Sequence, residues 1–87
     1  MIKIFFVYAE NCEHCNLALS TIESAMKKYP KTSCEILKFH YDSKAAISIA
    51  INKGISDLPG FVIGDDVYIG ENYSEERIIE SIKKASK

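Results

Sequence analysis

The chain has 87 residues, of which 47% are hydrophobic, and a formal net charge of −1 at pH 7. This length predicts one domain, residues 1–87, with enough apolar side chains for a small core. Acidic and basic residues are mixed along the chain, so neither nucleic acid nor a membrane is an expected partner. The apolar start, residues 1–8, is too short for a membrane span and lacks the features of a signal peptide. We therefore expect a cytoplasmic protein, and we expect it to be monomeric.

The first half of the chain predicts a strand, a long helix and a second strand. Residues 2–8 form a nearly continuous β-branched and aromatic run, typical of a strand that is covered on both faces. From residue 13 the apolar residues follow the spacing of one helix face. Pro30 ends this helix because the residue before a proline avoids the helical region. Residues 33–41 alternate in character and predict a second strand, at an edge of the sheet.

The second half predicts a short helix, a β-hairpin and a final helix. Ser43 is a suitable N-cap for a helix over residues 44–53. Two short apolar runs, residues 61–63 and 67–69, are joined by Gly-Asp-Asp, which is typical of a hairpin. Ser74 caps the last helix, whose acidic first turn and basic last turn suit the helix dipole.

The predicted order of elements is β-α-β-α-β-β-α. The first β-α-β unit must be a right-handed parallel crossover, whereas the closing hairpin is antiparallel. We therefore expect an α/β fold with one four-stranded mixed sheet, in which the first strand is central and helices cover both faces.

Two cysteines stand at the start of the long helix, in the sequence Cys12-Glu13-His14-Cys15. This spacing is consistent with half of a zinc site or with a redox dithiol. A total of three cysteines, an odd number, argues against a secreted disulfide framework. Cys12 falls at the helix N-terminus, where free N–H groups and the helix dipole stabilise a thiolate. Cys15 lies one turn later on the same side, close enough to form a disulfide with Cys12.

This element order, with Cys-x-x-Cys at the end of the first strand, resembles the thioredoxin/glutaredoxin superfamily in its short, glutaredoxin-sized form. The resemblance covers essentially the whole chain. Residues 51–70, INKGISDLPGFVIGDDVYIG, are similar to the stretch where a helix of that family ends in glycine, a loop reaches a cis-proline and a hairpin follows. The resemblance implies a thioredoxin-like fold, a cis bond before Pro59 and a backbone at Leu58 that is offered to the substrate. Tyr8 is the nearest aromatic residue where thioredoxins have a tryptophan, and we expect it beside the substrate.

The resemblance also implies a dithiol–disulfide oxidoreductase, an electron carrier, with Cys12 as nucleophile and Cys15 as resolving thiol. Cys12 attacks a disulfide in a protein or a small molecule, and Cys15 displaces the reduced product. An imidazolium at His14 favours the Cys12 thiolate, whereas a carboxylate at Glu13 opposes it. We expect His14 to make the protein more oxidising than a Pro-Tyr pair between the cysteines would.

Three acidic residues separate the chain from glutaredoxins that bind glutathione. Glu10, Asp57 and Glu71 lie where a glutathione carboxylate would approach, and like charges disfavour its binding. The amides that follow Gly70 at the start of the last helix, together with Ser74, remain able to receive a carboxylate. The electron donor stays open between glutathione and a flavoenzyme of the thioredoxin-reductase type. No bound cofactor is expected.

Two other functions stay open at this point. A binding module could keep this fold without turnover, although such a module has no need of both cysteines. A zinc site requires four well-placed ligands, and Cys12, His14 and Cys15 supply at most three. The remaining candidates, Cys34 and His40, lie on another predicted strand, so no metal is expected. We predict that Cys34 is a small buried hydrophobe and that His40 is a surface residue of an edge strand.

Overall fold

The computed structural model describes residues 1–87 and contains four strands and three helices in the predicted order. Several predicted strand ends differ from the observed ones by one residue, and the bounds of the short helix agree. No helix is both long enough and apolar enough to cross a membrane. The elements are β1 (Ile2–Tyr8), α1 (Glu13–Lys28), β2 (Cys34–His40), α2 (Lys44–Lys53), β3 (Gly60–Ile63), β4 (Asp66–Ile69) and α3 (Glu75–Ala85).

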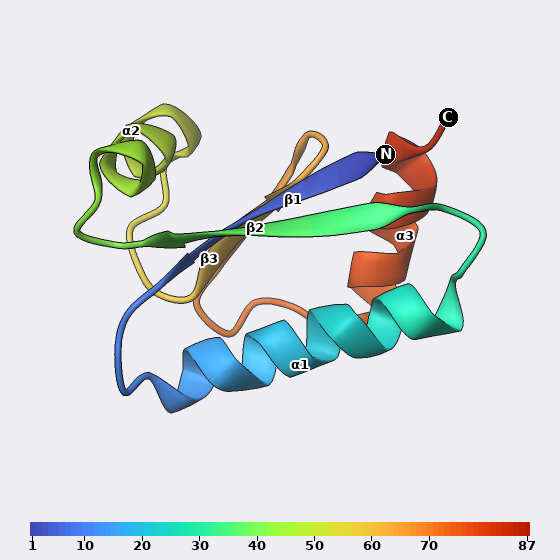
Figure 1. Ribbon diagram of the computed structural model, residues 1–87, viewed down its shortest axis with the longest axis horizontal. Helices are drawn as coiled ribbons and strands as arrows, with labels where there is room; N and C mark the ends of the chain where they lie inside the picture. Colours follow the sequence, from blue (N-terminus) through green and yellow to red (C-terminus); the bar gives the residue numbers. More distant parts are fainter.

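The strands form one mixed sheet in the order β2-β1-β3-β4 (Figure 1). β1 pairs with β2 in parallel, and the pairs β1–β3 and β3–β4 are antiparallel. β1 is therefore an interior strand and β2 an edge strand, both as predicted. The apolar run of β1 suits this place, because Ile4 and Phe6 are buried on one face and Val7 on the other.

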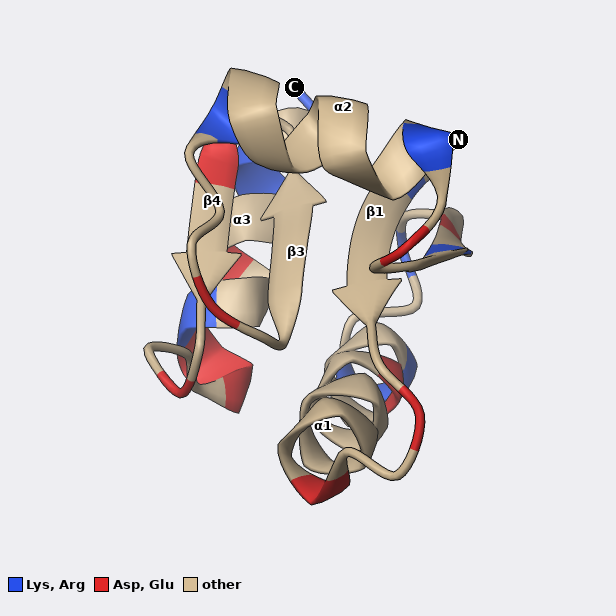
Figure 2. Cartoon of the chain, turned by 90° about the vertical axis from the view of Figure 1, so that its left-hand side faces the viewer, with Lys and Arg blue, Asp and Glu red and all other residues tan.

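The helices cover both faces of the sheet, as predicted (Figures 1 and 2). α1 and α3 pack together on one face, where their apolar residues meet those of β1, β3 and β4 in the main core. α2 lies on the opposite face, over one end of the sheet. The largest fully buried apolar members of the main core are Ile4, Phe6, Ile22, Phe61, Ile63, Ile78 and Ile82.

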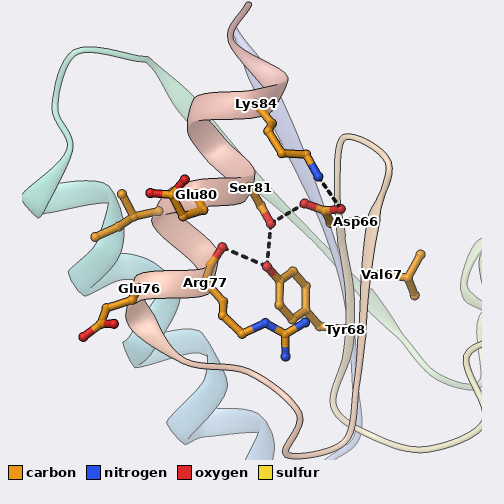
Figure 3. Close-up of a pocket in the computed structure, with 9 residues that line it drawn as sticks. Asp66, Val67, Tyr68, Glu76, Arg77, Glu80, Ser81 and Lys84 are labelled. Atoms are coloured by element: carbon orange, nitrogen blue, oxygen red, sulfur yellow. Dashed lines mark hydrogen bonds and ion pairs between the residues drawn. The ribbon is translucent and has the colours of Figure 1, made fainter.

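A polar cluster fixes α3 against β4 (Figure 3). The Tyr68 hydroxyl donates to the Arg77 carbonyl at 2.9 Å and contacts the Ser81 hydroxyl, which donates to Asp66 Oδ2 at 2.6 Å. Lys84 Nζ donates to Asp66 Oδ1 at 3.0 Å. These groups line a groove of about 660 Å³ between the strand and the helix. Both shielded hydroxyls have partners, so the cluster can stabilise the docking of α3 without leaving an unpaired polar group.

All three helices begin at the same end of the sheet. β1, β2 and β4 run in one direction, because β1 and β2 are parallel and β4 is two antiparallel steps from β1. Each of these strands leads into a helix, and β3 starts at the same end. We call this end the motif end; it is formed by the connections 9–12, 41–43, 54–59 and 70–74.

Candidate active site

Cys12 and Cys15 form a disulfide at the start of α1. Their Cα atoms are 5.2 Å apart, within the range that a disulfide requires. Cys15 is 2% exposed and belongs to the main core, whereas Cys12 is half-buried. Cys15 is thus shielded and Cys12 partly exposed, which is the difference that a resolving thiol and a nucleophile require.

Cys12 is also the N-cap of α1. Its backbone is extended, with φ −102° and ψ 104°, and its Sγ accepts a hydrogen bond from the Cys15 N–H at 3.1 Å. This N–H is one of those at a helix start that have no partner within the helix. The hydrogen bond and the helix dipole both favour negative charge on Sγ, so Cys12 in its reduced form lies in surroundings that favour thiolate. Asn11, with φ 53°, turns the chain into this position.

Residues of all four strand ends line up beside the motif. His40 is the parallel partner of Tyr8, the last residue of β1. On the other side of β1, Val7 pairs with Gly60, and the next position along this ladder brings Pro59 beside Tyr8. The Gly70 N–H donates to the Pro59 carbonyl at 2.8 Å. His40, Tyr8, Pro59 and Gly70 therefore form a row across the motif end, and the connection to Cys12 leaves this row at Tyr8.

Asp57 joins the proline loop to the connection after β4. The Leu58–Pro59 bond is cis, as the resemblance implies, and the Leu58 N–H donates to Asp57 Oδ1 at 2.9 Å. A Cβ placed on Gly70 would lie 3.2 Å from Asp57 Oδ2, so the carboxylate rests against this glycine. Gly70 also has φ 65°, a backbone conformation that favours glycine. Asp57 therefore lies among Leu58, Pro59 and Gly70, three of the predicted substrate-binding residues.

His14 reaches across the motif end to an acidic residue. Its Nδ1 lies 2.7 Å from Glu71 Oε1, and the two side chains are 61% and 72% exposed. This contact joins the first turn of α1 to the connection between β4 and α3. Glu13, beside it in the first turn, is exposed. The sequence predicts tuning roles for both residues from their place between the cysteines, but spacing along one helix cannot reveal the Glu71 partner.

His40 belongs to the site more closely than the prediction of an edge-strand surface residue suggests. Its Nδ1 accepts a hydrogen bond from the Asp42 N–H at 3.3 Å, and its Nε2 lies 3.0 Å from Glu10 Oε1. Nε2 is shielded from solvent and makes no well-oriented hydrogen bond. The Tyr8 ring stands edge-on to the imidazole, with 5.6 Å between the ring centroids. The register of β1 and β2 brings the two rings together, so a prediction of that register could have found His40.

Ser74 and Cys34 have places that limit what they can do. The Ser74 hydroxyl accepts a hydrogen bond from the Arg77 N–H at 3.2 Å and so caps α3 at the motif end, as predicted. Cys34 is opposite Ile2, at the far end of β1, and it is half-buried rather than fully buried as predicted; this partial burial raises the pKa of its thiol. Since Cys34 and His40 occupy opposite ends of β2, they cannot complete one metal site with the motif. No three His, Cys, Asp or Glu side chains are grouped as metal ligands.

No family model and no curated protein matches this sequence. Solved structures are similar to its fold. An uncharacterized thioredoxin-like protein from Clostridium perfringens aligns with 98% of this chain and 71% of its own, with a TM-score of 0.76 and 13% identity. Mitochondrial thioredoxin 3 from Saccharomyces cerevisiae, in its oxidized form, aligns with 95% of this chain and 77% of its own, with a TM-score of 0.65 and 23% identity. Thioredoxin from Aeropyrum pernix aligns with 95% and 73%, with a TM-score of 0.64 and 21% identity.

These likenesses extend over nearly the whole of this chain. They agree with the mixed four-stranded sheet, its interior first strand and the helices on both faces described above. The chain has the thioredoxin-like fold.

Proposed function

We propose that the protein is a dithiol–disulfide oxidoreductase that works through Cys12 and Cys15. The observation that carries this proposal is the placement of the pair: the partly exposed Cys12 caps α1 with its sulfur and is bonded to the buried Cys15. Thiolate is the attacking species in disulfide exchange, and the N–H directed at Cys12 Sγ favours it. A module that only binds a partner needs neither sulfur in these positions.

The reaction follows from the two sulfurs. In the reduced protein the Cys12 thiolate attacks one sulfur of a substrate disulfide, and the bond between the two substrate sulfurs breaks. The first substrate sulfur stays on Cys12 as a mixed disulfide, and the second leaves as a thiolate that takes up a proton. Cys15, after losing its proton, attacks Cys12 Sγ and releases the remaining substrate thiolate, which also takes up a proton. Two electrons pass from the cysteines to the substrate, and a reductant must return them.

Tyr8 and Leu58, both half-buried, are the proposed substrate surface, because the row that contains Tyr8 adjoins the connection to Cys12. Pro59 and Gly70 are buried, and we propose that they shape this surface from beneath. The Leu58 backbone is the proposed pairing partner for an extended substrate. Its N–H already donates to Asp57, so a substrate that uses this N–H has to displace the carboxylate. Substrates with a positive group near the cysteine can compensate for that displacement.

The proposed electron donor is a flavoenzyme of the thioredoxin-reductase type rather than glutathione. Glutathione carries carboxylates, and it would meet those of Glu10, Asp57 and Glu71 at the motif end. Like charges at close range disfavour such an encounter. We also propose that the protein is a monomer, that it is located in the cytoplasm and that it carries electrons from the donor to the substrate.

A trapping experiment tests the reaction. In a Cys34→Ser background, Cys15→Ser leaves Cys12 as the single cysteine, and this variant should keep a disulfide peptide as a stable mixed disulfide that intact-mass measurement detects. The same background with both motif cysteines should release the peptide and form the Cys12–Cys15 disulfide. If Cys12 traps nothing and mild oxidation forms no intramolecular disulfide, the proposal is wrong.

Two coupled assays test the donor. Reduction of a disulfide substrate is followed once with glutathione and glutathione reductase, and once with NADPH and thioredoxin reductase. We expect turnover only in the second assay. Turnover only in the first would overturn the proposed donor, and none in either would favour a binding module that keeps the fold without turnover.

A further inference from the structure

Each of the four connections at the motif end carries one carboxylate and no lysine or arginine. In chain order these acids are Glu10, Asp42, Asp57 and Glu71. Figure 2 looks onto this end, and the connections into α1, into β3 and out of β4 are each marked red with no blue among them. The cations nearest to these connections are Lys44 and Lys53, at the two ends of α2, and Arg77, whose guanidinium donates to Asn72, so the four carboxylates outnumber them at this end.

An apolar groove of about 270 Å³ opens at the same end, between α2, the connection from α2 to β3 and the end of β1. Ile47 and Ile51 of α2 line the groove and are 47% and 76% exposed, so no other part of the chain covers them. Exposed apolar side chains that gather in one hollow are typical of an interaction surface. The large apolar lining residues are Val7, Tyr41, Ile47, Ile51, Ile55 and Leu58.

The groove lies on the α2 face of the sheet and adjoins the row at the motif end. Leu58 lines the groove and precedes Pro59, and Val7 lines it and precedes Tyr8, so both lead into the row at the motif end. Asp57 lines the groove as well and rests against Gly70. A peptide segment that lies across the row can therefore place one side chain in the groove and its neighbours beside the carboxylates.

We propose that the substrate is a disulfide in a polypeptide segment that carries an apolar side chain and lysine or arginine residues next to the reacting cysteine. This inference rests on the proposed function and adds the substrate class. The carboxylates attract such a segment and repel anionic disulfides, an effect that acts on the rate of encounter and weakens with salt. The groove removes the apolar side chain from water and so holds the segment at the row.

Matched peptide disulfides test the proposal. Three peptides of one length carry Lys, Gln or Glu beside the disulfide-bonded cysteine, and each is made with Leu or Ser at the position that would enter the groove. The second-order rate of thiol loss from the reduced protein is measured at low and at high salt. At about 0.01 M salt we expect the Lys peptide to react roughly tenfold faster than the Glu peptide, and at about 1 M the two rates should converge. The Leu form should react several-fold faster than the Ser form at either salt concentration.

Two variants locate the effect. Glu10→Gln combined with Asp57→Asn and Glu71→Gln should bring the Lys-to-Glu rate ratio close to one. The matched control combines Glu23→Gln, Glu35→Gln and Asp65→Asn, which removes three exposed acids outside the motif end, and it should keep the ratio.

A further pair addresses the groove. Ile51→Ser should remove the preference for Leu over Ser in the peptide, and Leu17→Ser, at an exposed apolar residue outside the groove, should not.

The outcomes separate the two proposals. Equal rates for the Lys and Glu peptides at low salt, while the Gln peptide still reacts through Cys12, would overturn the proposed substrate class and leave the oxidoreductase in place. A charge preference that the control variant also loses would overturn the assignment to the motif end. Failure of every peptide to react would overturn the proposed function, and the substrate class with it.

Discussion

The parallel strands β1 and β2 end side by side, and each leads through a short connection into a helix. The two helix starts share their geometry: Cys12 and Ser43 are both extended N-caps, and each accepts the N–H of the residue three positions later at 3.1 Å. At Ser43 the acceptor is a hydroxyl that also donates to the His40 carbonyl at 2.7 Å. At Cys12 the acceptor is a sulfur bonded to Cys15.

The comparison shows that the fold supplies the cap and that one atom decides what the cap does. A helix start requires an acceptor for its free N–H groups, and oxygen and sulfur both meet that need. Only sulfur can also exchange a disulfide, and the N–H that completes the cap favours the thiolate that does so. In the proposed reaction, stability and chemistry therefore use the same hydrogen bond at α1, whereas at α2 the bond serves stability alone.

The largest expected effect comes from giving α1 the same serine N-cap that α2 has. Cys12→Ser retains a good N-cap and removes the proposed nucleophile, so disulfide exchange should fall by a thousandfold or more, on the order seen when an enzyme nucleophile is removed. The free energy of unfolding of the reduced protein should change by less than about 0.5 kcal/mol. Peptide disulfide reduction and urea unfolding in excess reductant measure the two effects. A large loss of stability in this variant would show that the sulfur does more for the helix than a hydroxyl can.

The second largest effect comes from removing the cap of α2 while leaving the cap of α1 unchanged. Ser43→Ala removes the hydroxyl cap of α2 and should lower the free energy of unfolding by about 1 kcal/mol. The rate of exchange at Cys12 should not change, because Ser43 lies on the other βα unit. Ser43→Asp is the matched control, since aspartate is an equally good cap and should restore most of the stability. An exchange rate that falls together with stability would show that the two helix starts are coupled.

Sequence reasoning succeeds where the signal is local. The cap at Ser43 and the apolar run that follows it predict α2 with its observed bounds, and the change of period after residue 13 predicts α1. The Cys-x-x-Cys pair reveals the dithiol because its members are one helical turn apart. The resemblance, rather than any pattern of residues, supplies the cis bond before Pro59.

Contacts between distant segments could not be predicted in this way. The approach of His14 to Glu71 depends on how α1 lies against the connection after β4, and no period or spacing encodes that. The position of Asp57 against Gly70 likewise depends on the pairing of β3 with β4. Sequence reasoning places His40 on the surface, because its position beside Tyr8 follows from strand register and not from its own neighbours in the sequence.

A smaller effect concerns the histidine between the two cysteines of α1. We predict that His14, in the first turn of α1, favours the Cys12 thiolate when it is an imidazolium, and that the Glu71 carboxylate beside it offsets part of that effect. His14→Ala should therefore lower the thiolate fraction of Cys12 near neutral pH, and the reduction potential with it, by an amount equivalent to less than about tenfold. Glu71→Gln should act in the opposite direction. Thiolate absorbance against pH and equilibration with a redox buffer measure both, and an unchanged thiolate fraction and potential in His14→Ala would exclude the tuning role.

The smallest effect lies away from both helix starts, in the carboxylates that hold α3. The hydrogen bond from Ser81, followed by that from Lys84, lowers the pKa of Asp66 from its ordinary value. The hydrogen bond from Lys28 does the same to the pKa of Glu75. A carboxylate whose pKa is lower in the folded state than in the unfolded state stabilises the fold at neutral pH, and this contribution is lost as the pH falls through the folded pKa. Because these side chains face solvent, the contribution of each pair is small.

Acid should therefore loosen α3 before it affects the caps at Cys12 and Ser43, neither of which titrates in this range while the disulfide is intact. We expect the urea midpoint of the oxidised protein to be lower below about pH 4, where these carboxylates take up protons, than at pH 7. Asp66→Asn combined with Glu75→Gln should lower the midpoint at pH 7 and make it less dependent on pH. Glu23→Gln combined with Glu35→Gln is the matched control and should keep the full dependence, because those exposed side chains form none of the hydrogen bonds and ion pairs that hold α3. If the first double variant keeps the same dependence as the control, the acid sensitivity originates at the motif end, where the remaining carboxylates are concentrated.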